Sequence, residues 1–177
     1  ITLLLCCTLR LSGCGNGSTY RDIQGSELPT QDFQGFHIPV FPTAQDQLNY
    51  ARSGFPNPEA KRAALNFVAK KFPGSSDACG TAALNLAYMN LEPDYRFALQ
   101  IDYHDAIAAY ESVMKKFMGQ PQVQAKAHWY IGWLYCDVLK EPARGLPYFW
   151  YLVQHYSDLE MGIASPVHRV SLVSSGT

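Results

Sequence analysis

The sequence predicts an all-α fold in which antiparallel helix hairpins form an array after an extended N-terminal segment. From Glu59 onward the apolar residues recur every three to four positions, which is the period of an amphipathic helix. One helix pattern also returns along the chain: a shift of 45 residues places Phe72 on Phe117, and a further shift of 39 places Phe117 on Tyr156. A pattern that returns at such a period indicates stacked helical units.

The composition is that of a folded domain with little net charge. Of the 177 residues, 47% are hydrophobic and 16% are charged, which is enough apolar surface for a packed core. The 14 Lys and Arg residues nearly balance the 15 Asp and Glu residues, and charges of one sign do not form runs. Nucleic-acid binding depends on clustered cations, so no nucleic acid is expected as a partner.

Residues 1–13, ITLLLCCTLRLSG, read as part of a lipoprotein signal peptide. The apolar run is too short to span a bilayer, which takes about 20 residues, and it fits the core of a signal peptide better. Leu11 to Cys14 resemble the lipobox of bacterial lipoproteins, which implies that the Cys14 thiol carries a lipid anchor; Arg10 departs from that pattern. The alternative is a short hydrophobic N-terminus that packs on the domain. Gly15 after the cysteine implies the outer membrane, at its periplasmic face, as the destination.

Residues 14–42 are expected to form a lipid-anchored tether, because Gly, Ser, Pro and Gln occur throughout this segment. A short helix is predicted next, near TAQDQLNYAR. The helical repeat domain is expected over 43–161, and an irregular tail over 162–177. Within the domain, helical periodicity predicts further helices at EAKRAALNFVAKKF, GTAALNLAYMNL, YHDAIAAYESVMKKF, AKAHWYIGWLYCDVL and, with Pro147 near its start, YFWYLVQHYSDLE.

These hairpins resemble the tetratricopeptide repeat, whose first helix carries an apolar–Gly pair and then a tyrosine, as Ile131, Gly132 and Tyr135 do here. Together with the lipobox, the stretches FPGSSDACGTAALNLAYM and YHDAIAAYESVMKKF look like the BamD family of outer-membrane lipoproteins. That resemblance implies a non-enzymatic tetratricopeptide-like solenoid that binds envelope proteins, among them β-barrel assembly subunits. Family members usually have five hairpins, and about three are visible here.

In the tetratricopeptide family partners lie in a concave groove lined by the first helix of each hairpin. Helical spacing counted from Ala87 and Gly132 predicts the groove residues Thr81, Leu84, Tyr88, Leu91, Lys126, Trp129, Trp133 and Asp137. An aromatic groove suits extended peptides, since Trp and Tyr give large contact areas. The alternative is that these side chains pack between helices, and Trp150 is assigned to packing.

No catalytic residue, metal site or cofactor is expected. The histidines do not fall at the i, i+4 spacing of a helical metal pair, and neither CxxC, GxSxG nor a P-loop occurs. The group Asp102, His104 and Asp105 fits a helix start better than a metal site. Cys79 and Cys136 are expected at opposite ends of their helix layer, too far apart for a disulfide.

The sequence also fits two other interpretations. One is a pilotin-like secretion lipoprotein or a Tol–Pal-associated lipoprotein, both of which use similar hairpins. The other is the helical arm of a cell-wall enzyme, which would need a catalytic glutamate; Glu92, Glu111 and Glu141 lie in no supporting motif.

Overall fold

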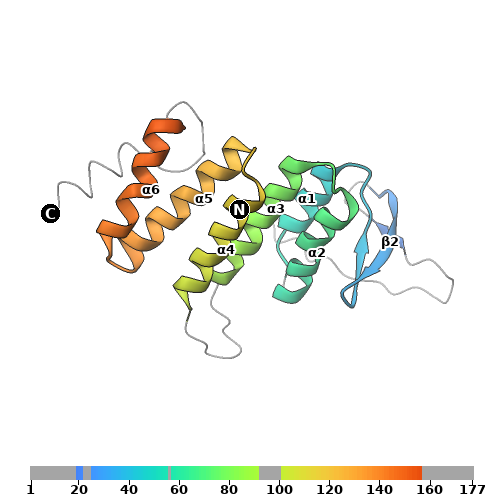
Figure 1. Cartoon of the computed structure of the whole chain (residues 1–177). Coiled ribbons are helices and arrows are strands. Elements are labelled where there is room, and N and C mark those ends of the chain that lie inside the picture. The colour runs from blue at the N-terminus through green and yellow to red at the C-terminus, as the bar shows by residue number, and fades with distance from the viewer. Residues whose placement is uncertain (1–18, 22–24, 56, 92–100, 157–177) are drawn as a thin grey trace, which may run out of the picture. The chain divides into compact units, whose positions relative to one another are not determined.

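The computed structural model describes residues 19–21, 25–55, 57–91 and 101–156, and the chain divides into two compact units, residues 1–40 and 41–177. The first unit contains a small antiparallel sheet and the second is helical (Figure 1). The predicted all-α character therefore holds for the second unit.

The first unit has three strands in the order β1-β2-β3: β1 Thr19–Arg21, β2 Glu27–Phe33 and β3 Phe36–Pro39. Gln34 and Gly35 join β2 to β3, and both have positive φ (51° and 82°). Two positive φ values in a two-residue loop give a turn whose twist matches that of the flanking strands. The segment 14–42 was predicted as a tether, so this sheet is a correction to that prediction within the described residues.

The second unit contains six described α-helices: α1 Ala44–Arg52, α2 Pro58–Lys71, α3 Ser76–Tyr88, α4 Tyr103–Lys116, α5 Pro121–Trp133 and α6 Pro142–His155. A 3₁₀ turn, η1 Met89–Leu91, extends α3, and a π-helical turn, η2 Leu134–Val138, extends α5. Each helix overlaps a segment that the periodicity predicts, and α3, α5 and α6 begin four to six residues earlier than those segments.

Local sequence explains several helix starts. The side chain of Asn57 accepts hydrogen bonds from the amides of Glu59 and Ala60, and that of Asp102 accepts from the amides of His104 and Asp105. Such caps satisfy amide groups that lack a partner within the helix. Asp102 therefore acts as the N-cap of α4, in agreement with the helix-start interpretation.

Each helix packs against the next along the chain, and the odd-numbered helices also contact one another, α1 with α3 and α3 with α5 (Figure 1). The core holds small residues where backbones approach and large residues between them. Gly132 lies against the ring of Phe149, and Gly145 lies against Cys136 and the carbonyl oxygen of Gly132. Tyr110 is fully buried and stacks on Tyr130, with ring centroids 4.9 Å apart.

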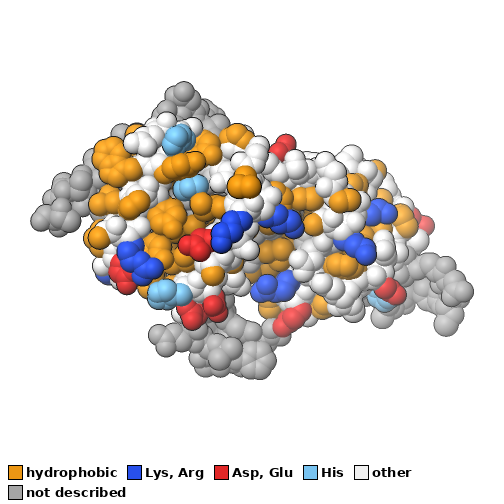
Figure 2. Space-filling model, viewed as in Figure 1, with side chains coloured by type: hydrophobic (Ala, Val, Ile, Leu, Met, Phe, Trp, Pro, Cys, Tyr) orange, Lys and Arg blue, Asp and Glu red, His pale blue; other side chains and the backbone are white. Residues whose placement is uncertain are grey.

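α6 differs from the prediction in two ways. The helix begins at Pro142, so Pro147 lies inside it, at an exposed position where the carbonyl that loses its helical partner can reach water. Trp150, assigned to packing from the sequence, is 50% exposed, and its neighbour Phe149 is the fully buried residue. Figure 2 shows hydrophobic side chains gathered over the end of the helical unit that carries α6.

Candidate functional site

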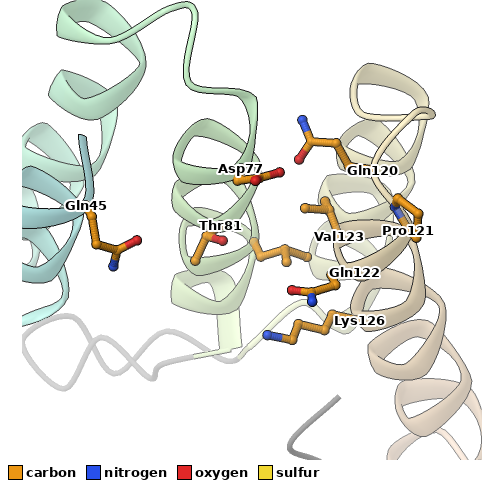
Figure 3. A pocket seen from close by; sticks show the side chains of 9 residues that line it. Gln45, Asp77, Thr81, Gln120, Pro121, Gln122, Val123 and Lys126 are labelled. Carbon is orange, nitrogen blue, oxygen red and sulfur yellow. The ribbon is translucent and has the colours of Figure 1, made fainter. Parts of the chain in front are cut away.

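A groove lies on the helical unit where α1, α3 and α5 meet, and its volume is about 480 Å³ (Figure 3). Its lining combines amide, hydroxyl, charged and apolar side chains: Gln45, Asp77, Thr81, Leu84, Gln120, Pro121, Gln122, Val123 and Lys126. Every lining residue comes from an odd-numbered helix or from the residue before α5. The groove therefore follows the face that these three helices share.

Gly80 allows α5 to approach α3 closely enough to form this groove. A Cβ atom at Gly80 would lie 2.6 Å from both the Oε1 atom of Gln120 and a methyl carbon of Val123. Real Cβ atoms do not make contacts this short, so glycine is the residue that fits here without a shift of its neighbours. The Gln120 amide can therefore lie against α3 at the end of the groove (Figure 3).

The groove carries one charge of each sign. Asp77 lies beside Gln120 in the first turn of α3, and Lys126 extends from α5 toward the opposite end (Figure 3). Among the residues that the structure describes, neither side chain forms an ion pair. Glutamine side chains can both donate and accept hydrogen bonds, so the lining can pair with the amides and carbonyls of another backbone.

Three of the predicted groove residues, Thr81, Leu84 and Lys126, line this groove. Tyr88 lies one helical turn beyond Leu84; it is 43% exposed and its ring contacts that of Tyr130, with centroids 6.0 Å apart. Leu91 is half-buried in η1 and packs on the core.

The remaining predicted residues lie further along α5 and its extension. Trp129 and Trp133 stack on each other with centroids 6.2 Å apart, and both pack with the core cluster that includes Phe149 and Leu152 of α6. Trp129 is buried, so for this residue the alternative of packing between helices is the correct one. Asp137 is half-buried in the π-helical turn η2.

Helical spacing missed several lining residues, and only some of them had a signal in the sequence. Asp77 and Gln122 lie one turn before Thr81 and Lys126, so the predicted stripes could have been extended to include them. Gln45 and Gln120 enter the groove because other elements of the fold bring them there. The spacing of α3 and α5 alone contains no information about either residue.

Apart from the groove, a cluster of histidine and tyrosine side chains lies between α5 and α6. His128 is buried, its Nδ1 atom is 2.8 Å from the carbonyl oxygen of Gln124, and its ring stacks on Tyr151 at a centroid distance of 4.4 Å. Burial lowers the pKa of His128; the contact with Gln124 acts in the opposite direction, and nearby His155 lowers the pKa further. His128 is therefore neutral in the folded protein at neutral pH.

The described residues contain no group of three or more His, Cys, Asp or Glu side chains that could hold a metal ion. Cys79 and Cys136 are both buried, and no disulfide joins them. Burial raises the pKa of the Cys79 thiol, an effect that Lys116 partly offsets, and a protonated thiol is a poor nucleophile. Glu141 pairs with Arg144 at the start of α6, 2.8 Å apart.

Cys14 and residues 162–177 lie outside the described part of the chain, as does Glu92. Within the described part, no helix is both long enough and apolar enough to span a bilayer.

Comparison of the chain with protein-family models, curated proteins and solved structures gives no match. Function is therefore inferred from the residues and geometry of the chain itself.

Proposed function

We propose that this protein is a non-enzymatic scaffold of the bacterial envelope that binds protein segments in the groove of α1, α3 and α5. The observation that carries the proposal is that alternate helices converge on one groove lined by side chains able to bind a polypeptide. The contacts of α1 with α3 and of α3 with α5 support a solenoid of the tetratricopeptide type, since such an arrangement keeps the first helix of each hairpin in one layer.

The lipobox-like residues extend the proposal to a place in the cell. In this proposal Cys14 carries a lipid that anchors the protein to the periplasmic face of the outer membrane, and the groove serves the assembly of β-barrel proteins. A Cys14→Ala variant should then lose both membrane association and incorporation of labelled palmitate. A variant that stays with the membrane and keeps its normal mass would refute the anchor without affecting the groove.

Photo-crosslinking tests the groove directly. A photoreactive residue replaces Gln122, which is exposed and lines the groove, and the matched control replaces Ser112, which is exposed on α4 outside it. In cells, the Gln122 probe should capture a β-barrel assembly subunit that the Ser112 probe does not.

The other outcomes separate the pathway from the site. Capture of a secretin or Tol–Pal component at Gln122 would keep the binding scaffold and replace the pathway. Equal capture at both positions, or capture only at Ser112, would contradict the groove as the binding site.

A further inference from the structure

We infer that the groove selects extended protein segments that carry a basic and an acidic residue three or four positions apart. This inference rests on the proposed function, because it names the chemistry of the segment that the proposed groove would bind. It starts from the two groove charges, Asp77 and Lys126, and from the alignment of the helices that hold them.

α3 and α5 lie side by side and run in the same direction. Gly80 faces Gln120 and Val123 near one end, and Tyr88 faces Tyr130 toward the other. The order of these contacts places Asp77 level with the start of α5, whereas Lys126 is level with Leu84. An α-helix rises 1.5 Å per residue, so the two charges are separated by about 10 Å along the helix axes.

An extended polypeptide covers about 10 Å in three residues. A segment lying along the groove can therefore place a cation near Asp77 and an anion near Lys126 when the two residues are three or four positions apart. The space between the two charges is lined by Thr81 and by amide side chains, which can pair with the backbone of the segment. Neither Asp77 nor Lys126 forms an ion pair with another described residue. A bound segment would supply the oppositely charged partner for each.

Fluorescence polarisation with labelled octapeptides tests this inference on the purified full chain. The peptides share a Gly/Ser/Ala background and differ at two positions three residues apart, which carry Lys with Asp, Lys with Lys, Asp with Asp, or two Ser residues. The wild-type protein should bind the Lys–Asp peptide best. Each partly exposed ion pair should contribute about a two- to fivefold gain in affinity, and the preference should disappear in about 1 M salt.

Single charge reversals should then change the order of affinities in opposite directions. An Asp77→Lys protein has two groove cations and should prefer the Asp–Asp peptide. A Lys126→Asp protein has two groove anions and should prefer the Lys–Lys peptide. The matched control for Lys126→Asp is Lys70→Asp, which makes the same charge change at an exposed position of α2 outside the groove and should keep the wild-type order.

A helix-terminal role of Asp77 alone would change stability but not the choice of peptide, and circular dichroism of each variant separates these effects. Peptides that bind equally well whatever their charge, or variants that keep the wild-type order, would overturn the inference and leave the proposed function standing. If the folded wild-type protein binds none of the peptides, both the inference and the proposed peptide groove are wrong.

Discussion

At Gly145, α6 lies close to the backbone of the preceding helix, and Gly145→Ala should destabilise the helical unit. A Cβ atom at this position would lie 2.8 Å from the carbonyl oxygen of Gly132 and 3.1 Å from the amide nitrogen of Cys136, and it would also meet the Cys136 sulfur. Two of these three obstacles are backbone atoms, which cannot rotate away as a side chain can.

The expected loss follows from two opposing effects. Overpacking of a buried site costs about 1–3 kcal/mol, and the upper end applies where backbone atoms must move. Alanine favours a helix over glycine by about 1 kcal/mol. The net loss should be about 2 kcal/mol, which for a chain of this size lowers the Tm by about 4–8 °C.

Guanidinium unfolding followed by tryptophan fluorescence, together with a thermal melt, measures this loss. The control is Gly119→Ala, because a Cβ there would meet nothing within 4 Å; its free energy of unfolding should change by less than about 0.5 kcal/mol. A Cys136→Ala protein lacks the sulfur but keeps the Gly132 carbonyl oxygen. Adding Gly145→Ala to that protein should therefore still cause most of the loss in unfolding free energy. If the Gly145→Ala protein has the same Tm as the wild type, α6 does not approach Gly132 as closely as described.

Three further predictions concern the core, pH and the groove. Phe149→Ala should lower the free energy of unfolding in guanidinium by about 3–5 kcal/mol because the ring is fully buried. Trp150→Ala, at a half-exposed site, should lower it much less. Equal losses in the two variants would contradict the burial of Phe149 in place of Trp150. The pKa of His128 is lower in the folded than in the unfolded chain, so the folded state binds fewer protons. The contribution of His128 to the free energy of unfolding should therefore be complete above about pH 6.5 and be lost as the pH falls below that value. Unfolding of a His128→Gln protein should therefore depend less on pH in this range, and an unchanged dependence would assign it to other groups. Gly80→Val should displace Gln120 and weaken peptide binding in the polarisation assay while the protein stays helical by circular dichroism; unchanged affinity would show that this end of the groove is not used.

The sequence alone was sufficient to find each helical segment, although α3, α5 and α6 begin four to six residues before the predicted segments. The local signals for helix starts are nevertheless present in the residues around them. Asn57 and Asp102 cap α2 and α4 through their own side chains, and Pro121 begins α5 where its missing amide hydrogen is not needed. The same local periodicity placed Thr81 and Lys126 on the stripes that line the groove. Each of these features needs information from only one or two turns of chain.

The tertiary structure decided which faces of those helices are covered. Trp129 and Trp150 are both aromatic residues in helical segments, yet one is buried and the other half-exposed, because α6 packs on the side of α5 that carries Trp129 and presents Phe149 to it. Gln120 joins the groove because Gly80 allows α5 to lie close to α3, and Gln45 joins it because α1 packs on α3. Likewise, the sheet of β1, β2 and β3 depends on pairing between strands and on two positive φ angles at Gln34 and Gly35. Periodicity describes one element at a time, whereas burial, grooves and strand pairing are set by contacts between elements distant in sequence.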